Sequence, residues 1–165
     1  VMETLACYMP KHNRPSDDDI YLAGLLHDIG FLVLDYLDPD LSDQFHARLN
    51  HGRDSSVEEI ESELLGISHG EIGAILGQHW NLPETIVASI YNRQVFDADQ
   101  ATAARPLVAL TNFTEKLLPV FGFADATAKD IAEADWRSLG LDSCNAEQIK
   151  TKVQKIILDS GAAEP

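Results

Sequence analysis

The stretch from Ile20 to Tyr36 constrains the fold more than any other, because it is apolar almost all round and carries an adjacent histidine and aspartate at its centre. A helix that is apolar on every side belongs in the interior of a protein. Neighbouring helical residues point about 100° apart, so His27 and Asp28 are not expected to face each other, although both could reach one ion at the helix edge. A buried carboxylate is costly unless it is paired, hydrogen-bonded or bound to a metal. The sequence therefore predicts a central buried helix whose polar pair needs a partner.

Glycine and proline divide the rest of the chain into pieces of helical length, and no segment alternates with period two. Further helices are expected over residues 40–49, 56–65, 68–80, 83–90, 105–121 and 149–157. The first residues, from Val1 to Ala6, have the pattern of the middle of a helix with no cap before it. We therefore expect an all-α, compact helical bundle that forms a single domain over residues 1–165, as a fragment of a longer protein.

The composition limits the kinds of partner. The formal net charge is −15, from 12 basic and 27 acidic residues, so a phosphate backbone would be repelled and nucleic-acid binding is not expected. The apolar stretches are judged too short for a membrane span, and no signal-peptide pattern opens the chain. Cys7 and Cys144 lie far apart without a CxxC partner, which favours two reduced thiols. We expect a cytoplasmic protein whose partners are neither nucleic acid nor membrane.

A capping pattern accompanies a third candidate ligand. Ser68 is followed three residues later by Glu71, the pattern of a capping box at the start of a helix. His69 lies at this start and could turn toward His27 and Asp28, or it could cap and pack. The glycines at positions 70, 73 and 77 allow close helix packing. The glutamates of residues 56–65, at positions 58, 59, 61 and 63, are expected to form mainly a solvated face.

Two stretches of the chain resemble a known family. Residues 22–34 read Leu-Ala-Gly-Leu-Leu-His-Asp-Ile-Gly-Phe-Leu-Val-Leu, which resembles the His-Asp helix of the HD superfamily. Residues 66–73 follow the pattern Gly-x-x-His-x-x-x-Gly, and residues 80–84 read Trp-Asn-Leu-Pro-Glu. Together they are similar to the HDOD subfamily, the HD-related output domains of bacterial signalling proteins, over roughly residues 1 to 120. The resemblance implies an all-α fold and a regulatory role.

The resemblance also implies which residues could hold a metal. HD enzymes are metal-dependent phosphohydrolases whose ligands are a first histidine, the His-Asp pair and a distant aspartate. His27 and Asp28 match the pair, and His69 is a further candidate. Imidazole and carboxylate ligands together suit iron, manganese or zinc.

Other positions depart from the enzyme pattern. The distant aspartate aligns with Asn112, and a neutral amide is a weaker ligand than a carboxylate. HDOD relatives often carry a His-His pair after the Leu-Pro helix, and here Asn92 and Arg93 align with that region. Arg93 would place a positive charge near any metal. The first ligand histidine is expected at or before Val1. These departures predict a degenerate metal site.

Two functions therefore remain open. In one, the chain is a regulatory signal-transduction output domain that acts through protein–protein interaction, without catalytic residues or a cofactor. Its partners would be signalling proteins or a fused receiver or sensor domain, and Asp28 would be satisfied by helix N-termini or by His69. In the other, the chain is a metal-dependent phosphohydrolase or phosphodiesterase that acts on a nucleotide or cyclic dinucleotide with divalent iron, manganese or zinc. A purely structural domain would leave the buried pair unexplained.

Overall fold

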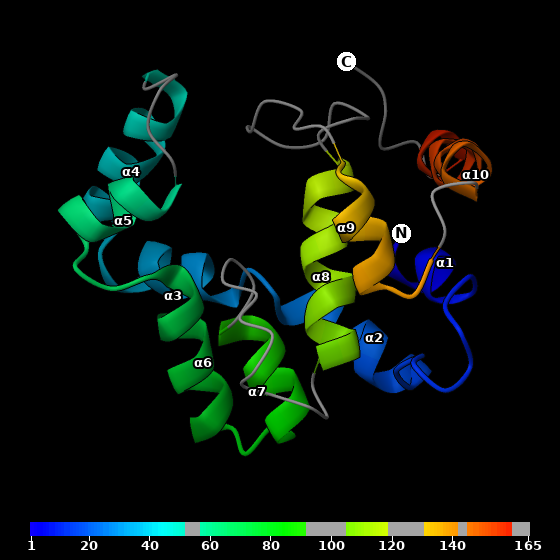
Figure 1. The fold of residues 1–165 in the computed structure, drawn as a ribbon. Coiled ribbons are helices and arrows are strands. Elements are labelled where there is room, and N and C mark those ends of the chain that lie inside the picture. Colours follow the sequence, from blue (N-terminus) through cyan, green and yellow to red (C-terminus); the bar gives the residue numbers. More distant parts are fainter. Residues whose placement is uncertain (52–56, 92–104, 119–130, 142–144, 160–165) are drawn as a thin grey trace.

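The computed structural model describes residues 1–51, 57–91, 105–118, 131–141 and 145–159, and within these ranges every regular element is a helix (Figure 1). In chain order the helices are α1 (Met2–Ala6), α2 (Asp17–Leu26), α3 (Ile29–Leu37), α4 (Pro39–His51), α5 (Val57–Leu64), α6 (His69–His79), α7 (Glu84–Tyr91), α8 (Arg105–Leu117), α9 (Glu133–Ser138) and α10 (Ala146–Asp159). The predicted all-α class is confirmed.

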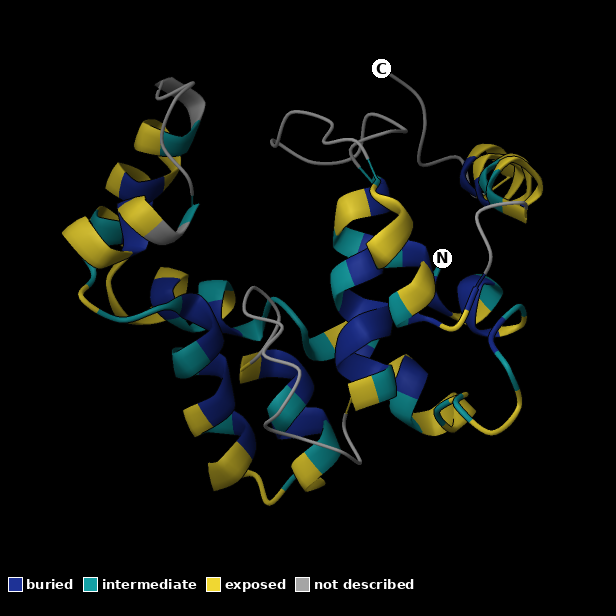
Figure 2. Cartoon of the chain, in the orientation of Figure 1, coloured by how far each residue is buried: buried dark blue, intermediate teal, exposed yellow. Residues whose placement is uncertain are grey.

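The main core lies where α1, α2, α7, α8 and α10 turn their apolar sides toward one another (Figure 2). Each of these five helices contributes a side chain that is at most 1% exposed, namely Leu5, Ile20, Ile90, Leu110 and Ile149. Eight of the thirteen residues of α8 are buried, because its apolar residues recur at helical spacing on more than one side. Short α9 covers α8 through Trp136, whose ring lies 4.7 Å from that of Phe113.

A second, smaller apolar group joins α3 to the α4–α5 hairpin. Phe45 of α4 and Ile60 of α5 are both buried, and the Phe31 ring of α3 lies 5.4 Å from the Phe45 ring. Phe45 and Ile60 do not belong to the main core cluster. The hairpin accordingly stands at the far left of Figure 1, with α3 between it and the main core.

The expectation of one central helix buried on all sides is wrong in two respects. The segment is divided into α2 and α3 by His27 and Asp28, and Asp28 has φ −104° and ψ 12°, outside the ideal helical values. One side is also open to solvent: Leu25 and Leu32 are each 63% exposed and Tyr36 is 85% exposed. The apolar composition of a segment does not show which of its side chains pack against other elements.

The judgement that the apolar stretches are too short for a membrane span is also wrong. The segment Asp17–Leu37 is 21 residues long, and by length and composition alone it could cross a membrane. Only 22% of its most apolar window is buried within the described structure. Core helices of globular proteins meet the same criterion, so the finding does not identify a membrane protein.

Most predicted helix starts are confirmed. The helix α6 begins at His69 directly after Ser68, and α7 begins at Glu84 directly after Pro83. The predicted close packing of the glycines is also confirmed, because a Cβ atom added at Gly73 would lie 2.8 Å from Ile90 Cγ2 of α7. The helix α9 was not expected from the sequence, because six residues are too few to show a helical period.

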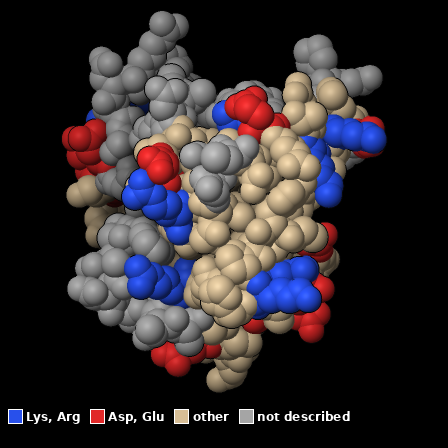
Figure 3. Space-filling view, turned by 45° about the vertical axis from the view of Figure 1, so that its right-hand side comes forward, with Lys and Arg blue, Asp and Glu red and all other residues tan. Residues whose placement is uncertain are grey.

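The charged side chains are not segregated on the face shown in Figure 3. Basic and acidic groups lie next to one another around a broad uncharged area. Ion pairs of this kind within single helices join Arg137 to Glu133 and Lys150 to Glu147. The basic residues on this face are therefore accompanied by acidic neighbours and do not form a continuous basic surface.

Candidate functional site

His27 lies at the break between α2 and α3 and is held by three polar contacts. Its Nδ1 is 3.0 Å from the backbone oxygen of Gly24. Its Nε2 is 3.1 Å from Asp28 Oδ2 and 3.0 Å from Glu115 Oε1 of α8. Both ring nitrogens are therefore engaged by oxygen acceptors. The imidazole ties the end of α2 to α8.

The prediction that His27 and Asp28 do not face each other is wrong, and the helix break is the reason. In a continuous helix adjacent side chains diverge by about 100°. Asp28 leaves the helical conformation, which allows its carboxylate to turn back to the ring of the preceding residue. The structure gives Asp28 a partner that the sequence did not suggest, the ring of His27.

The two carboxylates change the charge state of the His27 ring. Burial of the ring acts to lower its pKa, but hydrogen bonds and charge from Asp28 and Glu115 outweigh burial and raise the pKa of His27 to about 9. The ring is then an imidazolium at neutral pH, with Nδ1 donating to Gly24 and Nε2 donating to the carboxylates. The cluster is a small ion-pair network between α2, α3 and α8.

This network predicts a fall in stability at alkaline pH. A pKa raised from 6.5 to about 9 on folding means that the folded state holds the proton more tightly, so the stabilisation is complete below pH 6.5 and is lost as pH rises through about 9. The loss is at most about 3 kcal/mol, and solvent at the half-exposed Asp28 reduces it. Denaturant unfolding at pH 6 and pH 9.5 measures the loss. In His27→Gln this part of the pH dependence should disappear, and equal pH profiles for both proteins would contradict the assignment.

The same three side chains could hold a cation. The ligand atoms of His27, Asp28 and Glu115 all lie within 4.8 Å of one another, and each side chain is partly buried. One imidazole nitrogen and two carboxylate oxygens form a donor set that fits iron, manganese or zinc. The described part of the chain therefore offers a three-residue set, in which Glu115 was not foreseen.

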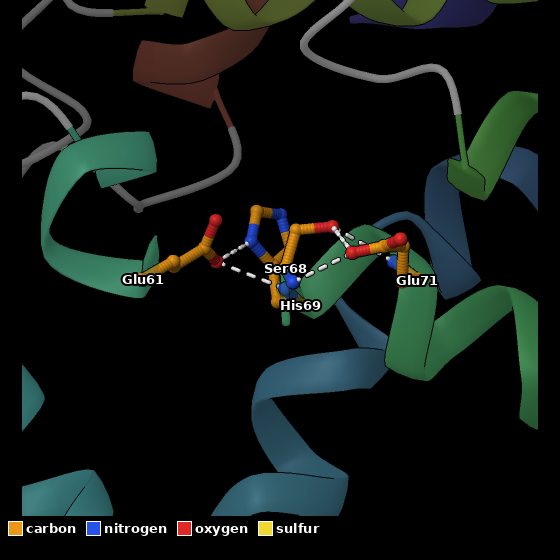
Figure 4. A network of polar contacts seen from close by, with 4 residues as sticks. All are labelled: Glu61, Ser68, His69 and Glu71. Carbon is orange, nitrogen blue, oxygen red and sulfur yellow. Dashed lines mark hydrogen bonds and ion pairs between the residues drawn. The ribbon is translucent and has the colours of Figure 1, made fainter. Parts of the chain in front are cut away.

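His69 does not join this set. It lies at the first position of α6, where its Nδ1 bonds to Glu61 Oε1 of α5, and its backbone N–H donates to the same oxygen at 3.0 Å (Figure 4). Both side chains are only 1% exposed. The His69 ring also stacks on Phe31 of α3, with centroids 4.0 Å apart. The hypothesis that His69 turns toward His27 and Asp28 is therefore replaced by a role that joins α3, α5 and α6.

Glu61 contradicts the prediction of a solvated glutamate face. Its side chain is buried, and among the described residues no hydrogen-bond partner reaches its second oxygen, Oε2. The sequence did contain a signal. At 100° per residue Glu61 falls between Val57 and Leu65 on the apolar stripe of its helix.

The start of α6 shows the predicted capping box beside this pair. Ser68 Oγ accepts a hydrogen bond from the backbone N–H of Glu71 at 3.1 Å, and Glu71 Oε2 accepts one from the backbone N–H of Ser68 at 3.0 Å (Figure 4). This reciprocal arrangement fixes where α6 begins. It therefore also fixes the position of the His69 backbone N–H that faces Glu61.

Of the three positions predicted to be degenerate, the structure describes only Asn112. Asn112 lies on α8 and is half-buried, one turn before Glu115. Asn92 and Arg93 lie outside the described residues, so their alignment stays a prediction. The signal for Glu115 was its place three residues after Asn112, on nearly the same side of the helix.

Comparison with known proteins places the chain in a family. The model of the HDOD domain matches residues 1–96, more than half of the chain. The chain belongs to the HDOD family. The match includes both His27–Asp28 and the α5–α6 region with its buried pair, whereas Glu115 lies beyond the matched residues.

Two relatives of this HDOD chain are informative. An uncharacterized protein of Treponema pallidum (strain Nichols) is 32% identical over 72 residues, which is 44% of this chain and 14% of that protein. The crystal structure of a "Putative signal transduction protein" from Marinobacter aquaeolei VT8 superimposes with a TM-score of 0.80 and is 28% identical. The superimposed region includes 93% of this chain and 33% of the Marinobacter chain. The chain thus spans a third or less of the length of either relative.

Proposed function

We propose that this HDOD chain is a regulatory signal-transduction domain that acts through protein–protein interaction, with a degenerate HD metal site. The observation that carries the proposal is that both ring nitrogens of His27 are engaged within the protein, Nε2 by Asp28 and Glu115 and Nδ1 by the backbone oxygen of Gly24. The remaining candidate ligand, His69, is committed to Glu61. The likeness to a protein described as acting in signal transduction supports the same function.

In this proposal the His27–Asp28 pair has a structural task. Its ionic contacts join the two halves of the broken α2–α3 segment and link them to α8. A partner that bound across these helices would act on elements whose relative positions the network fixes. The polar pair then serves to hold a binding surface in one conformation.

A second function is favoured by the donor set of His27, Asp28 and Glu115. A divalent metal held there would supply polarisation of a phosphoryl oxygen and activation of water. The three side chains would hold it. Saturable Mn²⁺ binding that is lost in Glu115→Gln would favour this second function, whatever the catalytic activity.

The two functions predict different results in a hydrolysis assay. Bis(p-nitrophenyl) phosphate and a cyclic dinucleotide are incubated with the chain in Mn²⁺, with Asp28→Asn as the matched variant. For a regulatory domain we expect equal background rates from both proteins. A native rate about tenfold or more above that of Asp28→Asn would overturn the proposal and establish a metal-dependent phosphohydrolase.

A further inference from the structure

The outward side of α2 and α3 carries large apolar side chains that no described part of the chain covers. Tyr21, Leu25 and Leu32 are each 63% exposed, and Tyr36 is 85% exposed. We call these four residues the α2–α3 strip. Single exposed apolar residues are ordinary, but four along one segment form a patch of the kind that marks an interaction site.

The strip residues recur at helical spacing within each helix. Tyr21 and Leu25 are four residues apart in α2, as are Leu32 and Tyr36 in α3, and four residues bring a helix back to within about 40° of its starting direction. The buried residues of the same two helices recur on the opposite side, namely Ile20, Ala23, Gly30 and Leu34. In each of the two helices the strip residues therefore lie on the side opposite the buried residues.

Carboxylates follow one edge of the strip. Asp17 of α2 lies four residues before Tyr21, and Asp35 of α3 lies three residues after Leu32, so each falls beside the strip within its own helix. Their side chains remain 79% and 49% exposed although Asp17 pairs with Arg14 and Asp35 pairs with His46. No lysine or arginine occurs between Pro15 and Ala47. The strip is therefore an apolar surface with an acidic edge and no basic residue of its own segment.

We propose that the α2–α3 strip binds an amphipathic helix of a partner protein, with aliphatic residues on one face and lysine or arginine along one edge. The proposal rests on the regulatory function above and names the surface and the chemistry of its partner. The strip is about 22 Å long, which matches about four turns of helix. Apolar contact gives the interaction its free energy, and the acidic edge selects a basic helix and sets its orientation. The same edge repels an anionic lipid surface.

A synthetic Leu/Lys helix of about 16 residues, with its leucines on one face, is the probe. Fluorescence anisotropy measures its binding to the 165-residue chain, to the strip variant Leu25→Ser/Leu32→Ser and to the control variant Ile75→Ser/Leu158→Ser. The control residues are 60% and 61% exposed but lie on α6 and α10. We expect the strip variant to weaken binding by about tenfold or more and the control variant to leave it within about twofold. A Leu/Glu helix of the same pattern should bind the native chain at least about tenfold more weakly.

Three results would overturn the strip as the site of a basic helix. One is equal binding of a scrambled Leu/Lys peptide, because charge alone would then explain the affinity. Another is equal binding by the strip and control variants. The third is binding of phosphatidylglycerol/phosphatidylcholine vesicles that the strip variant abolishes while no peptide binds, which would assign the strip to a membrane. None of these results depends on hydrolysis, so failure here is distinguishable from failure of the regulatory function in the phosphodiesterase assay.

Discussion

Replacing Glu61 with alanine is expected to destabilise the protein by about 3–5 kcal/mol, because it removes one partner of a fully buried pair. His69 would keep its place at the start of α6 but lose the oxygen that serves both its ring and its backbone N–H. The buried N–H would then lack its acceptor, at the cost of an unmade hydrogen bond. Urea or thermal unfolding followed by circular dichroism measures the loss.

Glu63 of the same helix provides a matched control. Its carboxylate pairs with Arg48 at 2.6 Å, but both side chains are about half-exposed or more. An exposed ion pair of this kind contributes at most about 1 kcal/mol, so Glu63→Ala should remain close to the native stability. Equal losses in Glu61→Ala and Glu63→Ala would contradict the special role of the buried pair.

Gly30→Ala is also expected to lower the free energy of unfolding strongly. A Cβ atom at Gly30 would lie 1.9 Å from the backbone oxygen of His69 and 2.7 Å from its carbonyl carbon. Backbone atoms cannot rotate away as a side chain does, so α3 and α6 would have to separate. We expect a loss of about 3 kcal/mol or more in the free energy of unfolding, together with a change in the near-ultraviolet spectrum as Phe31 loses its stack on His69.

Gly24 is the control for this substitution. A Cβ atom there would lie 3.3 Å from Met2 Sδ, at the end of a flexible side chain. Alanine also favours the helix interior over glycine by up to about 1 kcal/mol, so Gly24→Ala should be neutral or slightly stabilising. A comparable loss in both variants would show that the close approach of α3 to the His69 backbone does not determine the result.

Local patterns predicted the helices well because the relevant forces act within a few residues. The capping box at Ser68 and Glu71 and the proline before α7 each determine a helix start from neighbours in sequence. The amphipathic pattern of residues 149–157 predicted Ile149, Val153, Ile156 and Ile157 on one side of α10, and all but Ile156, which is 37% exposed, are buried. These features do not depend on how the helices are later arranged.

The candidate site could be predicted only in part because its contacts join distant segments. His27 and Asp28 were recognised, but the partner Glu115 comes from α8, and only the fold brings it to the ring. The buried role of Glu61 followed from its position on an apolar stripe, yet its acidity led to the wrong expectation. The break between α2 and α3 was missed because no proline or other simple helix breaker lies at His27 and Asp28.

The position of the α4–α5 hairpin has a consequence for how the molecule unfolds. Its buried side chains Phe45 and Ile60 form a group separate from the main core, and the Glu61–His69 contact fastens the hairpin to α6. Asp35 of α3 also contacts Ser42 and His46 of α4. A segment with its own small core and few polar contacts to its neighbours can open while the remaining helices stay folded, as a separate cooperative unit. Opening of the hairpin would bring both members of the buried pair into water at once. The pair therefore couples the local stability of this hairpin to that of the α3–α6 contact beneath it.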